Sequence, residues 1–193
     1  MGTGQALTVP ARRRLDRRAF WAPVAAASIA ATLALNAGPH EPNLTSLITG
    51  AGLAALATTD ATTHTLPATH VRVLAGLTAV TMIGAAWWHD AWAPPLRALV
   101  GVALVAVLLV SLWLALPGAI AFGDVKVTVI AFAAAAAVSW RAGVVTIIVA
   151  CVIGGVAAVI ARRTRRHLAP VQPTIPFVPG LALGFVVGVM VPW

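Results

Sequence analysis

Hydrophobic residues run in long blocks along most of this chain, and polar residues are confined to short stretches between the blocks. A helix that crosses a bilayer needs about 20 apolar residues, with a range of roughly 17–25. Blocks of about this length recur seven times, so the pattern predicts about seven membrane-spanning helices. The predicted spans cover residues 20–38, 44–59, 71–88, 96–116, 125–140, 142–161 and 175–192.

Composition agrees with this pattern. Hydrophobic residues make up 60% of the 193 positions and the mean hydropathy is +0.94, which is outside the range of soluble globular domains. The spans leave little chain for a separate soluble domain. The predicted fold class is therefore all-α, a polytopic transmembrane helix bundle, with a basic cytoplasmic tail over residues 1–19 and one membrane-embedded domain over residues 20–193.

Basic residues are distributed unevenly between the two sides of the predicted bundle. Arginines cluster over residues 12–18, before the first span, and over residues 162–166, after the sixth. Seven alternating crossings place both clusters on one side, with Arg72 and Lys126, while Arg97 and Arg141 fall opposite. The positive-inside rule then predicts a multi-pass plasma-membrane protein whose amino terminus is cytoplasmic and whose carboxyl terminus is outside. The clusters are interpreted as anchors to anionic membrane lipid, not as a nucleic-acid interface.

Metal and disulfide chemistry find little support in the sequence. The single cysteine, Cys151, lies inside the sixth predicted span and has no partner for an internal disulfide. The five histidines are scattered without the spacing of metal ligands. We expect no metal centre and no cofactor.

Three glycines recur at four-residue spacing in the last predicted span, at Gly180, Gly184 and Gly188. This spacing places them on one helical face, where a neighbouring helix can approach closely. Packing within the bundle is the preferred interpretation, and a dimer seam is the alternative.

Two aspartates stand at the edges of predicted spans. Asp60 follows the second span and Asp124 precedes the fifth, so the alternation places both at the cytoplasmic membrane face. An acidic residue at such a depth usually faces the bundle interior or a water-filled cavity. Taken singly, Asp124 fits a helix N-cap and Asp60 fits the polar exit of a helix.

The surroundings of these aspartates resemble the type IV prepilin peptidases, a family of membrane-embedded aspartic proteases. AFGDVK, around Asp124, is similar to the family's GxGD motif and the valine and lysine that follow it. DATTHTLP runs from Asp60 to Pro67 and is similar to the family's first aspartate and its proline. IPFVPGLALG, residues 175–184, resembles a carboxyl-terminal family segment.

The resemblance implies that Asp60 and Asp124 are the catalytic pair. In an aspartic protease one ionised carboxyl draws a proton from water and the other, protonated, donates to the substrate carbonyl oxygen. Which aspartate is the base stays open. Gly123, Lys126 and Pro67 are the supporting residues: Gly123 through backbone freedom, Lys126 by favouring ionised Asp124 or by anchoring at the membrane face.

The resemblance also implies a function, with two departures. Ala121 stands where the family has the first glycine of GxGD, and a single cysteine means that the paired CxxC segment of longer members is absent. The chain thus resembles a short, peptidase-only hydrolase whose substrates are prepilins or pseudopilins of type IV pilus and protein secretion systems. The alternatives are a catalytically inactive homologue with an assembly role, and a small proton-coupled transporter.

Overall fold

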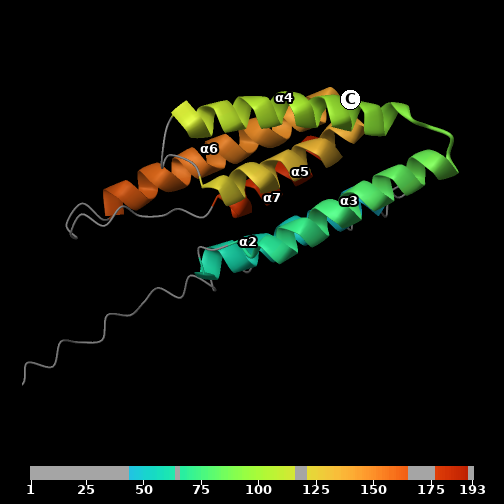
Figure 1. Cartoon of the computed structure of the whole chain (residues 1–193). Coiled ribbons are helices and arrows are strands. Elements are labelled where there is room, and N and C mark those ends of the chain that lie inside the picture. Colours follow the sequence, from blue (N-terminus) through green and yellow to red (C-terminus); the bar gives the residue numbers. More distant parts are fainter. Residues whose placement is uncertain (1–43, 64–65, 116–120, 165–176, 191–193) are drawn as a thin grey trace, which may run out of the picture.

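The computed structural model describes residues 44–63, 66–115, 121–164 and 177–190 (Figure 1). Within these ranges the chain forms six α-helices and no β-strand, so the described part is all-helical, as the sequence predicts. The helices are α2 Leu44–Thr63, α3 Ala68–Trp88, α4 Ala93–Ala115, α5 Phe122–Val138, α6 Trp140–Thr164 and α7 Val178–Met190. The predicted first span and basic tail lie outside the described residues.

Capping chemistry, more than the edges of the apolar blocks, sets the helix bounds. Pro67 is the N-cap of α3 and has φ −60° and ψ 120°, a conformation that fits the predicted break. Pro94 and Pro95 lie in the first turn of α4, where a missing N–H costs little. The fifth predicted span ends early, because Ser139 is extended and its Oγ accepts the N–H of Ala142 at 3.0 Å, which starts α6.

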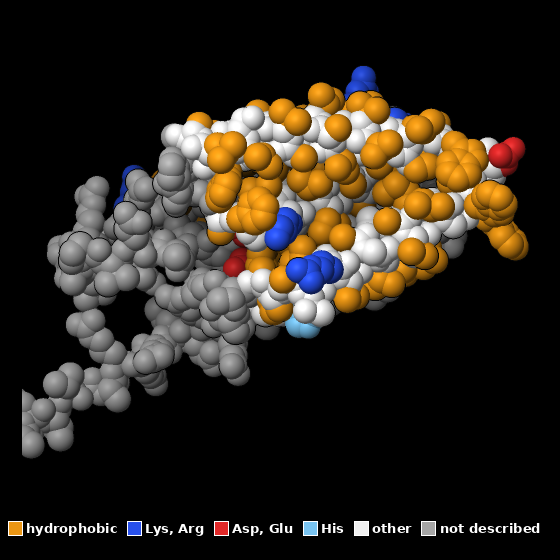
Figure 2. All heavy atoms as spheres, viewed as in Figure 1, with side chains coloured by type: hydrophobic (Ala, Val, Ile, Leu, Met, Phe, Trp, Pro, Cys, Tyr) orange, Lys and Arg blue, Asp and Glu red, His pale blue; other side chains and the backbone are white. Residues whose placement is uncertain are grey.

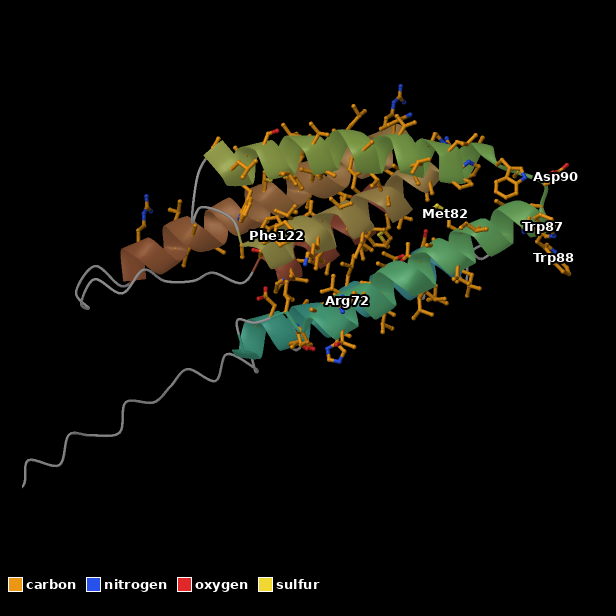
Figure 3. The ribbon with its side chains drawn as sticks, viewed as in Figure 1. Arg72, Met82, Trp87, Trp88, Asp90 and Phe122 are labelled. Carbon is orange, nitrogen blue, oxygen red and sulfur yellow. The ribbon has the colours of Figure 1, made fainter. Side chains whose placement is uncertain are left out.

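Successive helices run in opposite directions, so their ends gather at two ends of the bundle. The Trp113 and Phe122 ring centroids lie 5.3 Å apart, which joins the end of α4 to the start of α5. We call this the Asp124 end and the opposite one the Asp90 end; Figure 3 shows Phe122 and Asp90 well separated along the bundle. At the Asp90 end a cavity of about 590 Å³ lies between the starts of α2 and α4 and the ends of α3 and α5.

Helix α5 is the central element, and small residues let its neighbours approach it. Residues 130–137 are all buried, and six of the eight are alanines. The Phe132 ring fits between two glycines: a Cβ would lie 2.6 Å from the ring at Gly101 of α4, and 2.8 Å from it at Gly143 of α6. Glycine at both positions is therefore what allows α4 and α6 to pack on α5.

The glycine face of α7 packs on α6. A Cβ at Gly180 would lie 3.2 Å from the carbonyl oxygen of Ala150, and a Cβ at Gly184 would overlap the backbone of Thr146. Gly188 stands equally close to Ala142. This confirms the interpretation of the three-glycine face as a packing face within the bundle.

Polar contacts also connect helices inside the described part of this apolar structure. The hydroxyls of Thr49 in α2 and Thr78 in α3 are buried and lie 3.0 Å apart. Nη2 of Arg97 in α4 donates to the carbonyl oxygen of Ala137 at 3.1 Å. A cation there stabilises the carboxyl end of α5, whose last carbonyls lack partners within the helix. Arg97 thus has a structural role that explains a positive charge on its side of the bundle.

Three of the described helices are long and apolar enough to cross a membrane: Ala68–Trp88, Ala93–Ala115 and Trp140–Ile160. Their outer faces carry exposed large apolar side chains, among them Leu77, Val80, Leu104, Leu108 and Val156. Figure 2 shows such side chains spread along the length of the viewed face. Long apolar helices with exposed apolar side chains along their length indicate a membrane protein.

Candidate active site

Asp60 lies in the last turn of α2, and its side chain is buried, with 6% of its surface exposed. The backbone N–H of Val178 donates a hydrogen bond to its Oδ2 at 3.2 Å. Val178 begins α7, and the first N–H groups of a helix have no partner within that helix. Asp60 therefore caps α7 from a different helix and faces the positive end of the α7 dipole.

Asp124 lies in the first turn of α5, and its backbone is fixed on both sides. Its N–H donates to the carbonyl oxygen of Ala121 at 3.0 Å, and its own carbonyl oxygen accepts from Oγ1 of Thr128 at 2.7 Å. Ala121 is the N-cap, with φ −74° and ψ 140°. That conformation is open to any residue, so alanine in place of the family's glycine causes no backbone strain.

The two aspartates interact electrostatically. Asp124 precedes the apolar part of α5, which begins at Val125. The pKa of Asp124 is raised from its ordinary 3.8 to about 6, first by burial and second by the negative charge of Asp60. Because the negative charge of each carboxyl disfavours ionisation of the other, the two resist simultaneous ionisation. The structure thus brings together the two residues that the sequence singles out, in an environment that raises the pKa of Asp124.

Gly123 lies against the connection between α2 and α3. A Cβ at this position would be 3.2 Å from Cδ1 of Leu66, which is tighter than an ordinary contact. Leu66 is followed by Pro67, the N-cap of α3. Glycine at 123 therefore lets the start of α5 approach the chain that follows Asp60, a role that fits its prediction as a supporting residue.

The three segments that carry the family resemblance meet at the Asp124 end. Asp60 contacts Val178, which belongs to the 175–184 segment, and Leu66 contacts Gly123, which precedes Asp124. Helix α5 also packs against both α2 and α7. Segments far apart in the sequence thus form one contiguous site around the two carboxyls.

Lys126 is exposed and lies beside an aromatic ring. Its Nζ is 4.5 Å from the centroid of Phe122, one helical turn earlier. Figure 3 places Arg72 of α3 and Phe122 of α5 in the same half of the bundle, and Figure 2 shows two basic side chains close together on the viewed face. Burial and the charge of Asp60 are the causes of the raised pKa of Asp124, and Lys126 is not among them. Because Lys126 is exposed, it lies at the rim of the site.

Sequence reasoning did not find the two contributions of Val178 and Phe122. A backbone N–H has no residue signature, so nothing in the letter at position 178 marks it as a donor to Asp60. The sequence predicts that Lys126 favours ionised Asp124 or anchors at the membrane face, and it does not predict the contact of Lys126 with Phe122. The i, i+4 spacing of Phe122 and Lys126 was the available signal.

Comparisons with known proteins add no assignment: no family model, no curated protein and no solved structure matches the chain. Within the described ranges, no three His, Cys, Asp or Glu side chains form a group that could hold a metal ion. The chemistry of the site is therefore argued from the two carboxyls and their surroundings.

Proposed function

We propose that this chain is an intramembrane aspartic endopeptidase that removes leader peptides from type IV prepilin-like precursors at the cytoplasmic membrane face. The observation that carries the proposal is the convergence of three separate segments on Asp60 and Asp124. Each segment resembles a prepilin peptidase element, and the fold unites them by the Val178 hydrogen bond and the contact between Gly123 and Leu66. A chance match of short motifs gives no reason for such convergence.

The electrostatics of the pair suit hydrolysis of a peptide bond. An aspartic protease needs one ionised and one protonated carboxyl at the same pH. The raised pKa of Asp124, caused by burial and by the charge of Asp60, supports such a division. Either role needs a carboxyl, so each aspartate is indispensable in this proposal.

The proposed enzyme spans the plasma membrane about seven times, with its amino terminus in the cytoplasm. Support comes from the alternation of α2 to α7 and from the distribution of charge. Arg72 and Lys126 begin their helices near the Asp124 end, whereas Arg97 and Arg141 begin theirs at the Asp90 end. Together with the arginine clusters at 12–18 and 162–166, this distribution supports a cytoplasmic Asp124 end.

The proposed substrate class, which comes from the family resemblance, agrees with the position of the two aspartates in the chain. A precursor with a basic leader ahead of an apolar helix presents its scissile bond at the membrane surface when that helix enters the bilayer. In this proposal the two aspartates lie at this depth, because Asp124 precedes Val125 and Asp60 follows the apolar part of α2. Binding the apolar helix beside the bundle would hold the bond near the carboxyls and supply the proximity that hydrolysis requires.

Direct cleavage tests the proposal. The full-length protein, reconstituted in liposomes, is incubated with prepilin-like precursors from its own source, and the products are analysed by mass spectrometry and amino-terminal sequencing. We expect a single cut between the basic leader and the apolar segment. No cleavage of any such precursor, with the protein folded and inserted, would instead favour a homologue without peptidase activity.

A further inference from the structure

We propose that the amino terminus of α7 divides the work of the aspartate pair: Asp60 is held as the carboxylate and acts as general base, and Asp124 enters the reaction protonated and acts as general acid. Val178 is then a positioning residue that acts through its backbone N–H. This assignment rests on the proposed peptidase function and gives each carboxyl a distinct role within it.

Two features of the surroundings of Asp60 favour its ionised form, and its burial, deeper than that of Asp124, acts against them. A hydrogen bond donated to a carboxylate stabilises the charged state, and the N–H of Val178 lies 3.2 Å from Oδ2. The donor belongs to the first turn of α7, so the helix dipole adds to the effect. The glycine face of α7 packs directly on the α6 backbone, which fixes the position of this N–H.

The surroundings of Asp124 favour its protonated form. Within the described part of the chain no group donates a hydrogen bond to its carboxyl; the bonds at Asp124 are made by its backbone. Its place in the first turn of α5 acts in the opposite direction, toward the anion. Burial and the charge of Asp60 outweigh that contribution, because the pKa of Asp124 is raised and not lowered.

Other charged groups around the pair are few. In the described residues α7 has no ionisable side chain, and Asp60 is the one such group of α2. Helix α3 contributes His70 and Arg72 and α5 contributes Lys126, all three exposed to solvent or headgroups. These cations act through a polar medium, so their influence on the two carboxyls is screened. The hydrogen bond from Val178 to Asp60, for which the Asp124 carboxyl has no counterpart among the described residues, is therefore the difference on which the assignment rests.

The assignment gives a balanced reaction. The Asp60 carboxylate takes a proton from water as the water oxygen bonds to the carbonyl carbon, and Asp124 gives its proton to the carbonyl oxygen. The resulting tetrahedral diol collapses when protonated Asp60 donates to the amide nitrogen and the Asp124 carboxylate takes a proton from one hydroxyl. The carbon–nitrogen bond breaks, a carboxylic acid and an amine leave, and both aspartates return to their starting states.

Removing one N–H tests the assignment. Val178→Pro deletes the donor at the first position of a helix, where proline is well tolerated. Loss of this hydrogen bond makes ionisation of Asp60 harder. In a plot of kcat/KM against pH, the acid limb should therefore move to higher pH by about one unit, while the alkaline limb stays in place. Val178→Ala keeps the N–H and should leave both limbs in place, whatever it does to the rate.

The profile also identifies the opposite assignment. If Asp60 carried the proton, Val178→Pro would move the alkaline limb and leave the acid limb, because Asp60 would then be the second carboxyl to ionise. That result would overturn the proposal. So would a lower rate with neither limb moved in a folded variant, because the N–H would then have only a structural role.

A titration that needs no substrate separates this inference from the proposed function. The chain contains four aspartates, Asp16, Asp60, Asp90 and Asp124, so carboxyl-¹³C aspartate gives four resonances. Asp60→Asn and Asp124→Asn identify two of them. We expect the Asp60 resonance of the parent to titrate at lower pH than that of Asp124; the reverse order would refute the assignment. Absence of cleavage alone would refute only the peptidase function.

Discussion

The backbone N–H of Val178 lies 3.2 Å from Oδ2 of Asp60, so the first turn of α7 is capped by a carboxyl at the end of α2. This contact joins the third family-like segment to the first. Because α7 is held on α6 by glycines that leave no room for a Cβ, the position of the Asp60 carboxyl depends on packing two helices away. The predictions below follow from this dependence and from the coupling of Asp60 to Asp124.

Packing of α7 on α6 should be sensitive to a single methyl group. Gly184→Ala places a Cβ against the backbone of Thr146, so one helix must move. We expect a loss of about 1–3 kcal/mol in the free energy of unfolding, the usual cost of overpacking. The measurement is thermal unfolding in detergent micelles, followed by tryptophan fluorescence.

Gly155→Ala is the matched control, since no atom lies within 4 Å of the position where its Cβ would stand. Alanine has a higher helix propensity than glycine, by up to about 1 kcal/mol, so this variant should be as stable as the parent or slightly more stable. Equal unfolding midpoints for the two variants would mean that the α6–α7 seam is looser than described.

Stability should depend on pH through Asp124. Its pKa in the folded protein, about 6, exceeds the ordinary 3.8, so the folded state binds this proton more tightly than the unfolded state. The stabilising contribution of Asp124 is complete below about pH 3.8 and is lost as the pH rises through about 6. The Asp124→Asn variant has no carboxyl at this position and therefore does not lose stability as the pH rises. Its unfolding midpoint should exceed the parent's midpoint at pH 7.5 and approach the parent's midpoint at pH 4. A constant difference across this range would contradict the raised pKa.

The proposed topology can be tested by cysteine labelling. Cys151 is replaced by serine, and single cysteines are introduced at Ala91 and at Arg163, both exposed at opposite ends of the bundle. A membrane-impermeant maleimide applied to intact spheroplasts should label the Ala91→Cys variant, and the Arg163→Cys variant only after permeabilisation. Labelling of the Arg163→Cys variant in intact spheroplasts would place the Asp124 end outside the cell.

Much of the fold follows from the sequence because membrane helices are long and have a strong compositional signal. The breaks were harder to place. The predicted gap between residues 59 and 71 contains Pro67, the N-cap of α3, whereas the break at Ser139 was not predicted. Ser139 lies between apolar residues, and only its hydrogen bond to the N–H of Ala142 shows that α6 begins there.

The candidate site was predictable in part. Alternation of spans places Asp60 and Asp124 on the same side, but it does not say that α2 and α5 are neighbours. That relationship depends on which small residues meet which large ones, as where Gly123 at the start of α5 meets Leu66, which follows α2. The donor at Val178 was out of reach for a different reason, because a backbone N–H is common to every residue except proline.

The most direct test of the two-carboxylate account is the rate of leader removal by three variants with the same chemical change. Asp60→Asn and Asp124→Asn keep the side-chain shape but can neither take up nor supply the proton. Asp90→Asn is the control: Asp90 lies at the opposite end of the bundle and has φ 49°, a conformation that asparagine also adopts readily. With liposome insertion and unfolding midpoints checked for each protein, the account predicts at least a 100-fold loss of cleavage, on the order of general acid–base contributions, in the first two variants and parental activity in the third. Cleavage at the parental rate by either Asp60→Asn or Asp124→Asn would contradict it.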